Sequence, residues 1–171
     1  MAAVLVILSG LPGVGKTAIA RKVARRTGAV HLRIDSIEQA IRNLGVVQGS
    51  IDDAGYRVAY ALAEDNLRLG RTVIADSVNP IQLTRDAWID VARRANVQAV
   101  EIEIVCTDAN EHRRRVETRT TDVSGLKLPT WNEVLAREYA PWNRVHLIVD
   151  TASTTLDEKA ETILETLRKL L

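Results

Sequence analysis

The chain has 171 residues, of which 46% are hydrophobic and 26% are charged, and its formal net charge is +1. These values are typical of one globular domain with a sizeable core, and they exclude a global attraction to nucleic acid or anionic membranes. The only cysteine, Cys106, cannot form an internal disulfide, which favours a reducing cytoplasm, and it has no zinc-binding spacing with the three histidines.

The first predicted elements are a buried strand, a glycine-rich loop and a helix. Residues 3–8 form a continuous apolar run, too short to cross a bilayer and without a basic leader. Residues 10–17 then fit the pattern G-x-x-x-x-G-K-[ST]. Residues 16–27 have apolar side chains at helical spacing, and Gly28 is a candidate C-cap.

That loop predicts a nucleotide site. Its glycines allow the backbone N–H groups to converge on phosphate oxygens, next to the positive end of the helix. We expect Lys16 to reach the β- and γ-phosphates of ATP, and the Thr17 hydroxyl to bind Mg²⁺. The predicted nucleotide-binding residues here are Gly10, Leu11, Pro12, Gly13, Val14, Gly15, Lys16, Thr17 and Ala18.

The later segments alternate between strand and helix patterns. Strands are predicted over residues 29–34, 72–75, 97–105 and 145–149. Helices are predicted over 36–44, 54–69, 79–95, 109–118, 131–139 and from 155 onward, with 45–53 and 121–129 as loops. Capping residues support three of the helices: Asn79 before Pro80, Asp108 with Glu111, and Thr155 with Glu158.

This order predicts an α/β fold, a three-layer domain over residues 1–171 with a mostly parallel five-stranded sheet and helices on both faces. Ligands of such open sheets bind outside the carboxyl ends of the strands. Several polar residues follow the predicted strands at that edge: Asp35, Asp76, Thr107, Asp108, Asp150 and Thr151.

Two aspartates are candidates for chemistry. Asp76 ends an apolar strand, as a carboxylate that holds Mg²⁺ would, although it could also cap a turn. Asp35 follows the second predicted strand. It could be a helix N-cap, or it could accept the proton of a substrate hydroxyl.

Arginines and a tryptophan complete the candidate site. Arg115 and Arg119 share one face of a basic helix, and we expect at least one of them to neutralise phosphate charge from a mobile lid over about residues 109–140. Arg114 is expected to point outward. Arg85 and Trp131 are weaker candidates for the acceptor side, with Trp131 also a candidate lid anchor. Asp150 and Thr151 are placed near the adenine.

Together these motifs resemble the small P-loop kinases, which include shikimate kinase, gluconate kinase, adenylylsulfate kinase and chloramphenicol phosphotransferase. Residues 35–40 and 149–151 are most similar to the chloramphenicol phosphotransferase branch, where the aspartate matching Asp35 is taken as the base. The D-G-D-N stretch of adenylylsulfate kinases is missing. The closest similarity is to bacterial kinases labelled as ATP-binding or AAA-family. The resemblance implies the sheet order 2-3-1-4-5, ATP with Mg²⁺ as donor, and a small hydroxyl compound as acceptor.

The preferred function is therefore an ATP-dependent kinase that acts on a small-molecule hydroxyl. A kinase of nucleotides or polynucleotide ends is an alternative, supported by the basic helix but not by the net charge. A regulatory ATPase without an acceptor is a further alternative. Residues 36–60 and the helix that carries Arg85 are expected to form the acceptor pocket. The sequence names neither the acceptor nor the oligomeric state.

Overall fold

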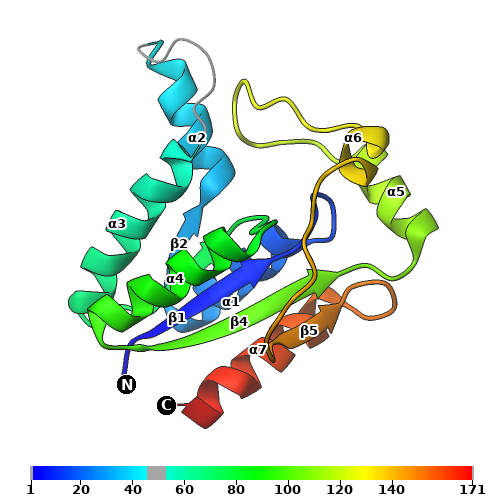
Figure 1. The fold of residues 1–171 in the computed structure, drawn as a ribbon. Coiled ribbons are helices and arrows are strands. Elements are labelled where there is room, and N and C mark those ends of the chain that lie inside the picture. The colour runs from blue at the N-terminus through cyan, green and yellow to red at the C-terminus, as the bar shows by residue number, and fades with distance from the viewer. Residues whose placement is uncertain (1, 46–52, 171) are drawn as a thin grey trace.

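The structure is a computed structural model that describes residues 2–45 and 53–170, so the predicted loop over 45–53 lies mostly outside the described residues (Figure 1). The elements are, in chain order, β1 (Val4–Ser9), α1 (Lys16–Thr27), β2 (Val30–Arg33), α2 (Ile34–Asn43), α3 (Ala54–Arg68), β3 (Val73–Asp76), α4 (Gln82–Ala95), β4 (Gln98–Val105), α5 (Ala109–Thr118), α6 (Trp131–Leu135), β5 (Leu147–Asp150) and α7 (Leu156–Leu170).

The five strands form one sheet in the order β2-β3-β1-β4-β5, as predicted. Every neighbouring pair among the described strands is parallel. The central strand β1 is buried along its whole length, as expected for a parallel strand covered on both faces. The register places Asp76 beside Leu8 on one side and beside Arg33 on the other. The carboxyl ends of β1, β2 and β3 therefore meet at one edge.

Helices cover both faces of the sheet, which confirms the predicted three layers (Figure 1). Helices α1 and α7 pack on one face, where Ile19 and Ile163 join the side chains of Val4 and Leu8. Helices α3 and α4 pack on the other, where Trp88 joins Leu5 and Ile7. Removing these apolar side chains from water is the main stabilisation of the fold. In the part of the chain that the structure describes, no helix is long and apolar enough to cross a membrane.

Two helix starts differ from the sequence prediction. Helix α2 begins at Ile34, so Asp35 lies within its first turn and is not an N-cap. Asn79 does not cap α4, which begins at Gln82; its φ is +49° and its side chain is buried. There the Asn79 amide donates to the Ser9 hydroxyl over 2.9 Å and accepts from the Trp88 indole N–H over 3.1 Å. Burial of a polar side chain with several partners outweighed the local capping pattern.

The other two caps follow the prediction more closely. Asp108 accepts from the N–H groups of Asn110 and Glu111, at 2.9 and 3.1 Å. Glu111 does not return the bond to Asp108, because its carboxylate binds Arg114 and Arg115 instead. At the start of α7, the side chain of Glu158 accepts from the Thr155 N–H over 2.8 Å, and Thr155 accepts from the Glu158 N–H over 3.3 Å. That reciprocal pair is the predicted capping box.

Candidate active site

The loop between β1 and α1 has a shape that other residues could not adopt. Gly10, Gly13 and Gly15 all have positive φ, at +139°, +87° and +105°. A Cβ at Gly10 would lie 2.2 Å from the Ile104 carbonyl oxygen, and one at Gly13 would lie 2.5 Å from a Val116 methyl group. The glycines are thus required both by conformation and by close packing.

Lys16 is buried against this loop. Its Nζ donates to the carbonyl oxygens of Gly10 and Leu11, at 2.8 and 3.0 Å. Burial lowers the pKa of Lys16 to about 8, although the nearby carboxylates of Asp76 and Asp35 oppose that shift. At pH 7 the side chain is therefore mostly a cation, held where the loop amides converge.

Asp76 lies at the end of β3, next to Thr17. Its carboxylate is 4% exposed and is 3.1 Å from Nε2 of His31 on β2. Burial acts to raise the pKa of Asp76, but the hydrogen bond with His31, the charge of Lys16 and the Thr17 hydroxyl together lower it. Asp76 is thus an ionised, buried carboxylate. One carboxylate and one hydroxyl are oxygen donors of the kind Mg²⁺ prefers, and few protein ligands suffice when phosphates and water supply the others.

The carboxyl ends of the strands open into a cavity of about 570 Å³. The glycine-rich loop, β2, β3 and α2 form its walls, together with the α5–α6 segment, residues 109–140. Lys16, Thr17, Asp35 and Asp76 all line this one cavity. Eight basic side chains line it against four acidic ones, the basic ones being Lys16, Arg21, Arg33, Arg42, Arg115, Arg119, Lys127 and Arg137.

Asp35 faces this cavity from the first turn of α2. Its carboxylate is half exposed and lies 3.8 Å from the guanidinium of Arg33. Its charge acts to raise the pKa of both Lys16 and Arg119, so the three groups are electrostatic neighbours. A carboxylate in this position can accept a proton from a ligand that lies between it and the loop.

The α5–α6 segment covers the cavity. In Figure 1 the chain after α5 reaches across toward α2. Asp122 pairs there with Arg33 over 2.8 Å and also with Arg21 on α1. At Gly125, a Cβ would lie 3.1 Å from Nε2 of Gln39 on α2. The structure therefore has the segment in a closed position, tied to both walls.

The base of this segment is also joined to the glycine-rich loop. Buried His112 on α5 lies with Nε2 2.8 Å from the Pro12 carbonyl oxygen, so Nε2 must carry the proton of that bond. The ring of Trp131 packs edge-on against His112, with the centroids 5.1 Å apart. Trp131 does not line the 570 Å³ cavity, so its predicted place beside a substrate is wrong, and it anchors α6 to α5.

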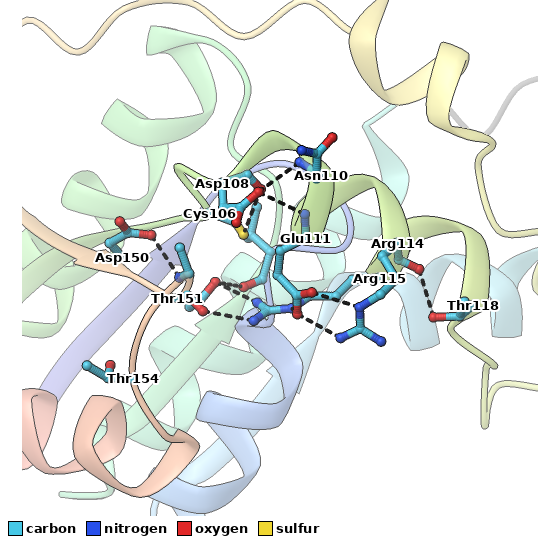
Figure 2. A network of polar contacts seen from close by, with 12 residues as sticks. Cys106, Asp108, Asn110, Glu111, Arg114, Arg115, Thr118, Asp150, Thr151 and Thr154 are labelled. Carbon is cyan, nitrogen blue, oxygen red and sulfur yellow. Dashed lines mark hydrogen bonds and ion pairs between the residues drawn. The ribbon is translucent and has the colours of Figure 1, made fainter.

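The two predicted lid arginines have different surroundings. Figure 2 shows Arg115 reaching from α5 to Thr151, where its Nη1 donates to the hydroxyl and its Nη2 to the carbonyl, both at 2.8 Å. Arg115 also pairs with Glu111 at 2.7 Å. Arg119 lies further along the segment, and its buried Nε and Nη2 have no hydrogen-bond acceptor among the described residues. Burial lowers the pKa of Arg119, with a smaller contribution from Arg33 in the same direction.

A second cavity of about 280 Å³ lies beside the first, and Arg115 lines both. Its walls are mostly apolar, with Ile19 and Leu156 among them, and Thr151 lies at its edge. Thr151 is also bonded to the loop, because its hydroxyl donates to the Val14 carbonyl over 2.7 Å. Asp150 does not line this cavity; it accepts from Thr107 and Ala152 and so stabilises the turn after β5.

Arg85 does not lie at the acceptor side of the site, contrary to the prediction. It is fully buried within α4, and among the described residues neither α3 nor α4 lines the 570 Å³ cavity. Its guanidinium donates to four carbonyl oxygens, those of Asn79, Pro80, Ala140 and Pro141, at 2.8–3.5 Å. Its Cζ lies over the rings of Tyr139 and Trp142. Arg85 thus fastens the end of the α5–α6 segment to the main body.

We expect Arg85→Ala to lower the free energy of unfolding by about 3–5 kcal/mol, because it leaves a void and four carbonyl groups without their donor. Urea denaturation would measure the loss. Arg93→Ala is the matched control, since Arg93 is exposed on the same helix and pairs only with Asp90; its effect should stay within about 0.5 kcal/mol. A loss for Arg85→Ala as small as the control's would contradict this account.

Sequence reasoning missed four residues of the site: His31, Arg33, Asp122 and His112. His31 and Arg33 lie on a short strand whose side chains show no strong pattern. Asp122 and His112 contact residues 89 and 100 positions away in the chain. No local spacing signals such contacts, so only the assembled sheet and its covering segment could place them.

A family model described as an AAA domain matches residues 5–141 of the chain. This range includes the glycine-rich loop, both candidate aspartates and most of the α5–α6 segment. None of the curated proteins matches the chain by sequence.

Solved structures share the whole fold at low sequence identity. The adenylylsulfate (APS) kinase CysC of Mycobacterium tuberculosis, solved with AMPPNP and APS, is 18% identical with a TM-score of 0.72, and 98% of each chain is covered. A gluconokinase of Sinorhizobium meliloti is 18% identical with a TM-score of 0.64, over 99% of this chain and 93% of that one. Kti12 of Chaetomium thermophilum, solved with ADP-AlF3, is 18% identical with a TM-score of 0.72, over 97% of this chain and 98% of that one. The fold is therefore that of the P-loop kinases.

Proposed function

Since the chain belongs to this AAA domain family, we propose that it is an ATP-dependent phosphotransferase that moves the γ-phosphate of ATP to a hydroxyl group of a small molecule. One observation carries the proposal: Lys16 and Asp35 line the same cavity, which is closed over by the α5–α6 segment. A regulatory nucleotide-binding protein needs the first of these groups but has no use for a carboxylate that faces the phosphates.

ATP would lie across the two cavities, with its base and ribose in the 280 Å³ cavity and its phosphates on the glycine-rich loop. The apolar walls of the smaller cavity suit a flat base, and Thr151 and Arg115 lie where the two cavities join. Lys16 would exchange its bonds to the carbonyls of Gly10 and Leu11 for bonds to phosphate oxygens. Such charge-assisted bonds are stronger than bonds to neutral carbonyls.

Thr17 and Asp76 would hold Mg²⁺, which fits their oxygen donors and the ionised state of Asp76. Bound there, the ion supplies charge neutralisation for the phosphates. His31 would fix the orientation of the Asp76 carboxylate by occupying one of its oxygens. Among the described residues no cluster of three or more histidine, cysteine or acidic side chains could hold a metal alone, so the ligand set would be completed by the nucleotide and water.

In the transfer step, the acceptor oxygen forms a bond to the γ-phosphorus while the bond from that phosphorus to the bridging oxygen breaks, and ADP leaves. Asp35 would take the proton of the acceptor hydroxyl. Arg119, whose buried donors have no other acceptor, would bond the oxygens of the transferring group. The α5–α6 segment, residues 109–140 of a single domain over 1–171, would act as the lid that excludes water.

The test is whether ADP formation depends on an added hydroxyl compound. We expect a coupled assay with MgATP to show slow ADP formation alone and a clear acceleration by at least one member of a panel of polyols, sugar acids, hydroxy amino acids and nucleosides. EDTA should abolish the acceleration, and transfer of label from γ-labelled ATP to the compound should match the ADP formed. Equal ADP formation with and without every compound would favour the regulatory ATPase instead.

A further inference from the structure

The charges of the 570 Å³ cavity exceed what a nucleotide needs, and the following inference rests on the proposed function. Five of the eight basic side chains have an acidic partner or neighbour. Arg21 and Arg33 share Asp122, Arg42 lies 3.5 Å from Glu38, and Arg115 pairs with Glu111. Lys16 is stabilised by the charges of Asp76 and Asp35.

The remaining three basic side chains are Arg119, Lys127 and Arg137, all from the α5–α6 segment. Within residues 2–45 and 53–170, no carboxylate oxygen lies within 4.0 Å of any of the three. Arg33 adds a buried Nε that has no acceptor in the same part of the chain. Its side chain is 13% exposed, so water solvates it poorly. Leaving charged donors in such a state costs free energy unless a ligand supplies the acceptor.

The donor nucleotide accounts for only part of this excess. The phosphates of MgATP carry about two negative charges after the ion is counted, and Lys16, Arg119 and the loop amides already face them. Arg33, Lys127 and Arg137 remain. Arg33 lies 3.8 Å from Asp35, and the charge of Arg137 acts on Arg119 and on Glu38, which is the next acidic residue of α2 after Asp35. These cations therefore surround the carboxylate proposed to receive the acceptor's proton.

We propose that the acceptor carries an anionic group of its own, a carboxylate or a phosphate, which Arg33, Lys127 and Arg137 bind beside Asp35. The anion would fix the acceptor so that its hydroxyl lies between Asp35 and the γ-phosphate. It would also keep a neutral alcohol from binding well, because the cations would then stay buried without a partner. Two of the three come from the covering segment, so binding of the anion would also favour the closed position.

Anion binding can be tested apart from catalysis. With saturating AMPPNP and Mg²⁺ blocking the nucleotide site, we expect inorganic phosphate to raise the melting temperature of the full chain saturably. Arg137→Gln should weaken this effect at least about tenfold, the size expected for one charged hydrogen bond. Arg113→Gln is the control, since Arg113 is exposed on α5 and pairs with Glu117 away from the cavity. No saturable effect, or equal effects in both variants, would overturn the inference.

Turnover of matched compounds then distinguishes the two kinds of anion. The sets are glycerol, glycerate and glycerol 3-phosphate, and sorbitol, gluconate and sorbitol 6-phosphate. We expect a higher kcat/KM for the anionic members, by at least about tenfold, and Arg137→Gln should narrow that ratio without changing the KM for ATP. Preference for the acids would identify a carboxylate, and preference for the esters a phosphate. Equal turnover of the neutral members would contradict the inference while leaving the kinase function intact. Phosphate binding that depends on Arg137, with no turnover of any compound, would support the anion site and count against the kinase.

Discussion

Lys16→Ala is expected to lower kcat/KM for phosphoryl transfer by about 10³-fold, which is typical of losing a preorganised cation from a transition state. The ammonium group is buried on the glycine-rich loop and bonded to two carbonyl oxygens, so no other described side chain is placed to replace it there. A coupled ADP assay over a range of ATP concentrations would measure kcat and KM. We expect both to worsen, because Lys16 would contact the phosphates before and during transfer.

Arg25→Ala is the matched control for that experiment. Arg25 is a cation on the same helix, α1, but it is exposed and does not line either cavity. Its removal should leave kcat/KM within about twofold of the unsubstituted protein, because screened surface charges contribute little. If Lys16→Ala retained normal turnover and normal nucleotide affinity, the nucleotide would have to bind elsewhere and the proposed mechanism would be wrong.

Asp35→Asn is expected to lower kcat by about 10²-fold or more, with the KM for ATP almost unchanged. Asparagine keeps the size of the side chain and its place in the first turn of α2, but it cannot accept the proton of the acceptor hydroxyl. Single-turnover measurements with bound ATP would show whether the loss falls on the transfer step. The expected split between kcat and KM follows because Asp35 lies across the cavity from the loop that would bind the phosphates.

Two further variants sharpen that test. Ser36→Ala changes the next residue of α2, which is exposed and does not line the cavity, and it should have little effect on kcat. Asp35→Ala measures the loss of the whole side chain, including its interaction with Arg33 at 3.8 Å. Equal kcat values for Asp35→Asn and the unsubstituted protein would assign Asp35 to charge balance alone.

The elements with a strong local signal were predicted well. Helix α1 was predicted over residues 16–27 and has those bounds, because its apolar spacing and Gly28 both act within the helix itself. The burial of Val100, Ile102 and Ile104 on β4 follows from their alternation with Glu101 and Glu103. By contrast, α6 was predicted to extend to Tyr139 but ends at Leu135. The chain beyond it is fixed by Arg85, whose bonds to Ala140 and Pro141 no local pattern could indicate.

The site divides in the same way. The glycine-rich loop, Lys16, Thr17 and the aspartates at the strand ends were all identified by sequence, because the phosphate-binding pattern is contiguous and parallel strands end at a common edge. Which cation would face which group was decided by packing. Arg85 and Trp131 were expected at the acceptor side, yet burial in the body of the protein and contact with His112 remove them from it.

The sequence by itself determined a parallel α/β sheet with a phosphate-binding loop after the first strand, since these features depend on neighbouring residues and on hydrophobic periodicity. Only the tertiary structure decided the composition of the cavity. Arg33, Asp122 and Arg119 come from segments far apart in the chain, and Arg33 and Asp122 meet only after β2 joins the sheet and the α5–α6 segment closes over it. Long-range contacts of this kind depend on how whole elements pack, which no short stretch of sequence encodes.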